Sequence, residues 1–170
     1  MLKFSNCFFA AALAVLTGCV NDTTSSIPAV TNLDVPRYLG KWYEYARLPN
    51  LFEKDMTKVS ATYSLRDDGN IKVVNCGYKD EKQKCITGIA KKADKSNSGE
   101  LKVSFFRPFY SRYRIIKLAP DYSWAVVTGK QKKYLWILSR TKNITPEAEK
   151  EIFTFLKQNG YPLEKLIFAQ

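Results

Sequence analysis

Short alternating segments separated by turn residues run through most of this chain, and they constrain its fold more than any other feature. Val59, Ala61 and Tyr63 are apolar, while the residues between them are polar. This period of two is typical of a half-buried strand. The break that follows, at 67–70, contains an Asp-Gly pair, a hairpin signal in which both central residues take a positive φ. The pattern therefore predicts antiparallel strands joined by tight turns.

Eight segments of this kind can be counted. They lie at 41–47, 58–65, 71–78, 84–91, 101–106, 113–118, 123–129 and 134–139, with an aromatic loop predicted at 109–112. An eight-stranded meander has two unpaired edges, and closure into an up-and-down barrel removes them. The length of 170 residues and the 45% hydrophobic content are enough for one domain with a sizeable core.

One helix is predicted after the eighth strand. Thr145 is a favourable N-cap, Pro146 suits the first helical position, and Asn159-Gly160 ends the apolar periodicity. This amphipathic helix should pack outside the barrel, and residues 166–168 can return as a short strand. The predicted fold class is all-β: an eight-stranded antiparallel barrel with one C-terminal helix.

The N-terminus carries export signals. Lys3 precedes an apolar run that is too short to span a bilayer and ends in Leu16-Thr17-Gly18-Cys19. These four residues resemble the bacterial lipobox, after which the cysteine is lipidated. The resemblance implies a signal peptide at 1–18, a lipidated Cys19 with a Ser/Thr-rich tether at 19–32, and a folded domain at 33–170. Val20, where some lipoproteins have Asp, favours the outer membrane.

Charge and residue usage exclude several functional classes. The net charge is +11 and the lysines are scattered without a dense stripe, which suits a solvated surface or anionic lipid headgroups better than nucleic acid in an exported protein. The sequence contains no histidine, so it offers no usual general base and no Ser-His-Asp arrangement. We therefore expect no enzymatic activity, no metal site and no cofactor.

Two cysteines remain once Cys7 and Cys19 are assigned to export and lipidation. Cys76 and Cys85 flank a predicted hairpin loop, and an oxidising compartment favours a disulfide between them. Two free thiols are the alternative.

Three separated motifs are similar to those of the lipocalin family. They are Gly40-Lys41-Trp42-Tyr43-Glu44-Tyr45-Ala46-Arg47, then Asp121-Tyr122 with Pro120 where the family usually has Thr, and Ile137-Leu138-Ser139-Arg140-Thr141. The run from Leu101 to Tyr110 adds similarity to the bacterial outer-membrane branch of the family. The resemblance implies that Arg140 covers Trp42 at the closed end of the barrel, as structural residues.

Alternation along the strands then predicts the lining of the barrel interior. The expected ligand-binding residues are Glu44, Ala46, Ala61, Tyr63, Val73, Asn75, Val103, Phe105, Tyr113, Ile115, Val127, Tyr134, Trp136 and Leu138. Near the mouth, Arg47, Arg107, Tyr110 and Arg112, together with Tyr113, could pair with a headgroup. Small residues such as Gly88, Ala90, Ala125 and Gly129 are expected to leave space in the interior.

The resemblance implies binding of a fatty acid or a lysophospholipid, for storage or transport. The domain would face the periplasm on a lipid anchor in the outer membrane, and a homodimer is compatible with the sequence. A barrel filled by its own side chains, in a structural or chaperone-like envelope lipoprotein, is the alternative.

Overall fold

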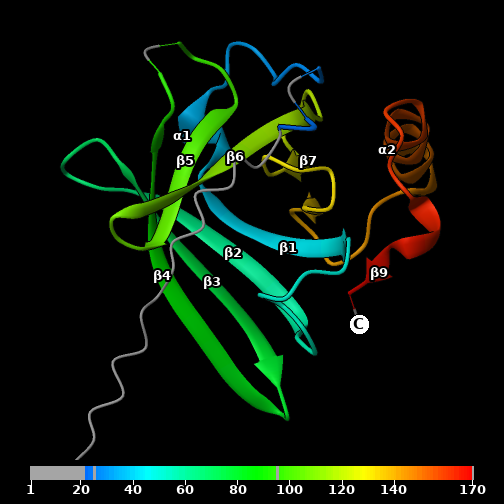
Figure 1. The fold of residues 1–170 in the computed structure, drawn as a ribbon, viewed down its shortest axis with the longest axis horizontal. Helices are drawn as coiled ribbons and strands as arrows, with labels where there is room; N and C mark the ends of the chain where they lie inside the picture. The colour runs from blue at the N-terminus through cyan, green and yellow to red at the C-terminus, as the bar shows by residue number, and fades with distance from the viewer. Residues whose placement is uncertain (1–21, 25, 95, 170) are drawn as a thin grey trace, which may run out of the picture.

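A closed antiparallel barrel forms the body of the protein in the computed structural model, which describes residues 22–24, 26–94 and 96–169 (Figure 1). Its strands are β1 (Gly40–Arg47), β2 (Thr57–Leu65), β3 (Ile71–Lys79), β4 (Lys82–Lys92), β5 (Glu100–Phe106), β6 (Phe109–Leu118), β7 (Trp124–Thr128) and β8 (Leu135–Ser139). Each strand pairs with the next along the chain, and β1 pairs with both β8 and β2. The predicted eight-stranded barrel is therefore confirmed.

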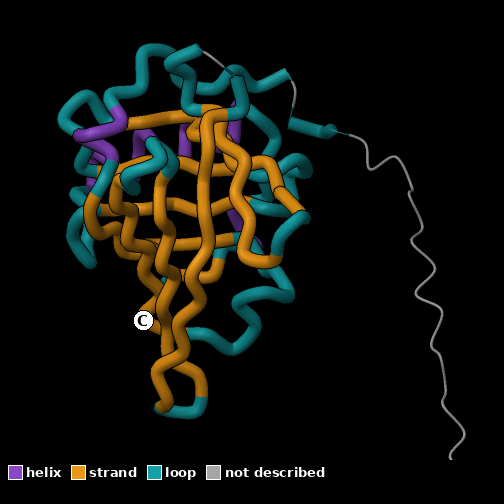
Figure 2. The backbone as a smooth tube through the Cα atoms, turned by 90° about the vertical axis from the view of Figure 1, so that its left-hand side faces the viewer, coloured by secondary structure: helices purple, strands orange, loops and turns teal. Residues whose placement is uncertain are grey.

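The barrel has two different ends. Because the strands run up and down in sequence order, the β1–β2, β3–β4, β5–β6 and β7–β8 connections lie at one end, which we call the open end. The chain enters β1 at the other end through α1 (Val35–Tyr38), a short helix capped by Asp34, which the sequence pattern did not predict. We call this the closed end. The β3–β4 hairpin projects well beyond the rest of the barrel (Figure 2).

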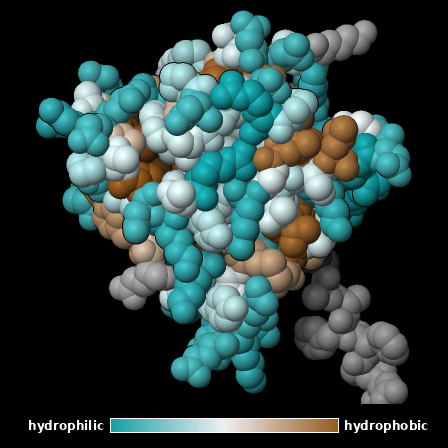
Figure 3. Space-filling model, turned by 180° about the vertical axis from the view of Figure 1, so that it is seen from behind, coloured by the Kyte–Doolittle hydropathy of each residue, from teal (hydrophilic) through white to brown (hydrophobic). Residues whose placement is uncertain are grey.

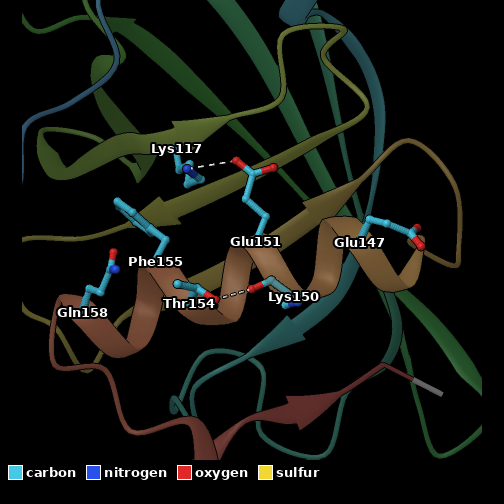
Figure 4. Close-up of a pocket in the computed structure, with 7 residues that line it drawn as sticks. All are labelled: Lys117, Glu147, Lys150, Glu151, Thr154, Phe155 and Gln158. Carbon is cyan, nitrogen blue, oxygen red and sulfur yellow. Dashed lines mark hydrogen bonds and ion pairs between the residues drawn. The ribbon is translucent and has the colours of Figure 1, made fainter.

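Helix α2 (Pro146–Gln158) packs against the outside of the barrel, as predicted. The Thr145 hydroxyl caps the helix by accepting a hydrogen bond from Ala148 N–H at 3.2 Å. Ile152 and Leu156 are fully buried against outward-facing residues of the strands. Figure 4 shows Lys117 of β6 reaching Glu151, at 3.0 Å, above a surface hollow that Phe155 also lines. The turn η1 (Leu163–Lys165) and the short strand β9 (Ile167–Phe168), which pairs with β1, follow the helix.

Two local predictions were wrong. Residues 109–112 belong to β6, because their backbone continues the ladder with β5; aromatic residues in that position extend a strand instead of forming a loop. At the Asp68-Gly69 turn only Gly69 has a positive φ, +76°. The connection is longer than a two-residue hairpin, since Arg66 N–H donates to Asn70 C=O at 2.9 Å.

The described part of the predicted tether is bonded to the barrel. Thr23 N–H donates to Lys130 C=O at 3.2 Å, and the Thr24 hydroxyl donates to Gly129 C=O at 3.0 Å. Arg114 is buried beneath this segment and donates to Ile27 C=O at 2.6 Å. We call the described residues 22–24 and 26–30 the N-terminal strap. Cys19 and the predicted signal peptide lie outside the described residues.

The disulfide between Cys76 and Cys85 is present, with an S–S distance of 2.09 Å, so this prediction is confirmed. The two residues are register partners on β3 and β4. Among the described residues, no helix has both the length and the apolar character needed to cross a bilayer. Seen from behind, the surface is largely hydrophilic with separate apolar patches (Figure 3).

Candidate functional site: the barrel interior

Trp42 and Arg140 close one end of the barrel. Trp42 is fully buried, its indole N–H donates to Tyr38 C=O at 2.8 Å, and the Arg140 guanidinium lies 3.8 Å above its ring centroid. Arg140 also donates to the carbonyl groups of Arg37 at 2.6 Å and Lys41 at 2.9 Å. A cation over an indole contributes about 0.5 to 2 kcal/mol, depending on desolvation. Arg140 therefore covers Trp42 as the resemblance implies, and their purely structural role stays a prediction.

Three tyrosines lie just inside this closure. The Tyr113 hydroxyl is 2.7 Å from that of Tyr38 and 3.0 Å from that of Tyr63. Burial raises the pKa of all three phenols, to about 12 for Tyr63. The expectation that Tyr113 would meet a headgroup near the mouth is therefore wrong, because its hydroxyl is already bonded at the closed end.

The middle of the interior is apolar. The predicted lining residues that pack there as one buried cluster are Ala61, Tyr63, Val73, Val103, Ile115, Val127 and Leu138, with Phe105, Tyr113 and Trp136 packed against them. Period-two alternation placed these residues in the interior, even at Phe105, where the β5–β6 register shifts between Val103 and Phe106. Their role in ligand binding stays a prediction.

A β-bulge in β1 changes which residues face inward. Glu44 pairs with Leu138, but Ala46 pairs with Ile137 and Arg47 with Trp136, so Tyr45 is an extra residue in the strand. After it the faces exchange. Ala46 packs in the outer cluster under α2, and Arg47 turns into the barrel at 4% exposure. The predictions of Ala46 in the pocket and of Arg47 on the rim were therefore wrong.

Glu44 and Arg47 form a buried ion pair in the barrel. The carboxylate of Glu53, from the β1–β2 connection, lies 3.9 Å from Arg47 Nε and accepts the Trp136 indole N–H at 2.8 Å. Burial, reinforced by the charge of Glu53, raises the pKa of Glu44 to about 7, although Arg47 opposes the shift. Two carboxyl groups thus share one guanidinium in a desolvated space.

Two oxygen atoms of the interior have no hydrogen-bond partner among the described residues. They are Glu44 Oε2 and Asn75 Oδ1. Asn75 faces inward because it is the register partner of Ala61, an interior residue. A buried acceptor without a partner is unfavourable by about 1–3 kcal/mol, so a ligand with a hydroxyl or amine group would find acceptors here.

Aromatic rings lie across the open end. Tyr134 stacks on Trp136 with a centroid separation of 6.4 Å, and Phe52 lies 6.0 Å from Tyr134. Glu53 was missing from the predicted interior, and Phe52, which is exposed, was missing from the predicted rim. Both residues belong to the β1–β2 connection, which has no hydrophobic periodicity, so alternation could not place them. The Phe-Glu pair itself was the one available signal in the sequence.

The other predicted rim residues are dispersed. Arg107 is exposed in the β5–β6 connection. The ring centroid of Tyr110 lies 4.3 Å from the ammonium nitrogen of Lys91. Arg112 lies outside the barrel, paired with Asp22 and, at 3.1 Å, with Glu100. Arg112 was therefore wrongly predicted as a headgroup ligand, and the structure does not bring these three residues together with Arg47.

Two glycines expected to leave space are covered by aromatic rings. A Cβ atom on Gly88 would lie 2.7 Å from a ring carbon of Phe105, and one on Gly129 would lie 3.1 Å from Tyr134 Cβ. The small residues therefore accommodate neighbouring rings at these positions. Among the described residues, no cluster of three or more potential metal ligands occurs.

Comparison with known proteins identifies the architecture. A family model described as a lipocalin-like domain matches residues 33–170. The chain belongs to the lipocalin family. This lipocalin is 40% identical to the outer membrane lipoprotein Blc of Citrobacter freundii over 162 residues, which are 94% of this chain and 92% of that protein.

More distant relatives extend the comparison. Apolipoprotein D of Mus musculus is 31% identical over 153 residues, 83% of this lipocalin and 78% of that protein. Insecticyanin from Manduca sexta has the same fold, with a TM-score of 0.69 at 20% identity over 85% of this chain and 84% of that one. The family model and the fold comparison agree on a lipocalin barrel.

Proposed function

We propose that this lipocalin binds a lipid with one acyl chain, a fatty acid or a lysophospholipid, and stores or transports it in the cell envelope. The observation that carries the proposal is the apolar interior between the tyrosines of the closed end and the aromatic rings of the open end. An acyl chain placed there would be stabilised by roughly 25 cal/mol per Å² of apolar surface removed from water.

The relatives support the location of this activity. The relatives from Citrobacter freundii and Escherichia coli are both named outer membrane lipoprotein Blc. The Leu16-Thr17-Gly18-Cys19 motif of this chain fits the same export route. We propose that Cys19 is lipidated and holds the domain on the periplasmic side of the outer membrane. Several acyl chains on one cysteine give firm anchoring, because one chain alone binds only reversibly.

Lipid binding can be tested with the purified mature protein. We expect native mass spectrometry to show a bound lipid and added lysophospholipid to change the fluorescence of Trp136. Trp136→Phe should lose the fluorescence response and keep the bound mass, whereas Trp124→Phe, a buried tryptophan of the outer cluster, should keep both. Absence of bound lipid together with an unchanged spectrum would refute the proposal.

A filled barrel is the second candidate. The rings of Phe105 and Tyr134 cover the glycines that were expected to provide space, and this observation favours a structural envelope lipoprotein. The same experiment separates the two functions. A filled barrel would show no bound lipid in native mass spectrometry, and added lysophospholipid would not change its fluorescence.

The anchor needs its own test, because an unprocessed signal would also keep the chain on a membrane. Metabolic labelling with an alkyne fatty acid should mark the wild-type protein and fail to mark Cys19→Ala. Cys7→Ala, in the predicted signal, is the matched control and should label normally. Equal labelling of Cys19→Ala and the wild type would disprove lipidation at Cys19.

A further inference from the structure

The largest exposed apolar side chains gather on two connections. In the described part of the chain, the four most exposed are Leu51 at 88%, Phe52 at 78%, Phe109 at 77% and Phe106 at 72%. The first two belong to the β1–β2 connection, and the other two flank the β5–β6 connection. Both connections lie at the open end, so these apolar residues occupy two of the four connections around the mouth. Apolar exposure of this kind on one face usually marks a binding surface.

Most exposed charges in the β1–β2, β5–β6 and β7–β8 connections are basic, whereas the projecting β3–β4 connection carries Asp80 and Glu81 between Lys79 and Lys82. Lys54 and Arg107 are exposed in the β1–β2 and β5–β6 connections, and Lys130 and Lys133 are exposed in the β7–β8 connection. The acidic residues of the β1–β2 connection are engaged elsewhere. Glu53 turns inward to Trp136, and Asp55 pairs with Lys79 at 3.3 Å. Apolar side chains interspersed with cations match an anionic phospholipid surface.

The N-terminal strap ends at the same end of the barrel. Besides the bonds of Thr23 and Thr24 to the β7–β8 connection, Lys132 N–H donates to the Thr23 hydroxyl at 2.9 Å. Asp22 is paired with Arg112. Asp22 begins the described part of the chain, and Cys19 precedes it by three residues in the sequence.

These observations combine into one orientation. We propose that the open end is a membrane-docking surface, on which the anchor at Cys19 and the apolar side chains of the β1–β2 and β5–β6 connections hold the mouth of the barrel against one phospholipid bilayer. A ligand would then pass between bilayer and interior without crossing bulk water. The inference rests on the proposed anchor at Cys19, and it is independent of which cargo the barrel binds.

The experiment uses the mature lipoprotein reconstituted into vesicles of phosphatidylethanolamine and phosphatidylglycerol. An NBD fluorophore is attached to a single new thiol in Phe52→Cys or Phe109→Cys, since Cys76 and Cys85 are already bonded. Leu65→Cys is the matched control: Leu65 is 61% exposed and lies at the closed end of β2. Circular dichroism verifies that each labelled protein is folded.

We expect the fluorophore at positions 52 and 109 to shift to the blue and to be quenched by brominated acyl chains, and the fluorophore at position 65 to do neither. Phe109→Glu should reduce the quenching at position 52, while Leu65→Glu should not change it. A probe that stays in water at both rim positions of vesicle-bound protein would overturn the docking orientation.

Two other outcomes identify a different explanation. A blue shift at position 52 without quenching by brominated lipid would mean that a second copy of the chain covers the mouth, and it would overturn the proposal. Protein that does not incorporate into vesicles at all would overturn the anchor and the orientation together. Neither outcome bears on lipid binding in the interior, which native mass spectrometry tests separately.

Discussion

The two ends of the barrel use similar residues for opposite purposes. At the closed end Trp42 is buried, its N–H is bonded, and Arg140 links three backbone carbonyl groups above it. At the open end, Trp136 is only half-buried, a guanidinium is shared by two carboxyl groups, and Glu44 Oε2 has no hydrogen-bond partner among the described residues. The difference shows that stability and recognition are separated along the barrel axis. Four predictions test it, from the largest effect to the smallest.

Removing the closed-end tryptophan should have the largest effect. Trp42→Ala leaves a cavity in a fully buried site and should lower the free energy of unfolding by about 3–5 kcal/mol. Trp136→Ala, at the open end, should lower the free energy of unfolding by less than half of that amount. Urea unfolding followed by circular dichroism measures both variants. Equal losses would mean that the two ends contribute alike to stability.

The buried carboxyl group should make stability depend on pH. The pKa of Glu44 is about 7 in the folded protein and 4.5 as the ordinary value, so the folded state binds this proton more tightly. The resulting stabilisation is complete below pH 4.5 and is lost as the pH rises through 7, by up to about 3 kcal/mol. Urea unfolding between pH 4.5 and 8 should show this decline.

Glu44→Gln should flatten that dependence. Glu53→Gln is the control. It removes the second carboxylate and lowers the pKa of Glu44, so the free energy of unfolding should still decline with pH, but over a narrower pH range. A Glu44→Gln variant with the same slope as the wild type would show that the decline comes from other groups.

Removing the guanidinium above Trp42 should have an intermediate effect. Arg140 is partly exposed, so Arg140→Gln should lower the free energy of unfolding by only about 1–2 kcal/mol, from the lost cation–π contact and carbonyl bonds. Arg140→Lys should recover part of this loss, since lysine keeps the charge and lacks the planar fork. Chemical unfolding at neutral pH measures both, and a fully stable Arg140→Gln protein would refute the structural role.

Removing an apolar side chain from the rim should hardly affect folding. Phe52 is 78% exposed, and Phe52→Ser should change the free energy of unfolding by less than about 0.5 kcal/mol. The same variant should weaken contact with vesicles if the rim docks on a bilayer. A large loss of stability would show that Phe52 supports the fold through its contact with Tyr134.

Regular ladders made most of the fold predictable from the sequence. The strands, α2 and the disulfide follow from alternation, capping residues and spacing, and most of the apolar lining of the interior follows from the same alternation. Prediction failed where a local irregularity changed the register. The bulge at Tyr45 moved Ala46 outward and Arg47 inward, and no residue type in that motif signals an extra residue.

The polar part of the site was harder to predict for a different reason. Glu44 was predicted in the interior, but its partner Arg47 was assigned to the rim and Glu53 was not assigned to the site. Their convergence depends on how the β1–β2 connection folds over the mouth, a long-range packing outcome. The N-terminal strap likewise has a composition typical of a linker, and only its hydrogen bonds to the barrel, such as those to Gly129, Lys130 and Arg114, show that it packs there.

The strap has a consequence for the order of folding. Thr24 and Gly129 are separated by 105 residues, and β1 finds its second neighbour only in β8. Both contacts close long loops, which makes them late events in a chain of high contact order. During synthesis, an N-terminal fragment would therefore expose an open sheet edge and an unpaired strap until the eighth strand is complete, and the nascent protein would depend on protection from aggregation throughout that interval.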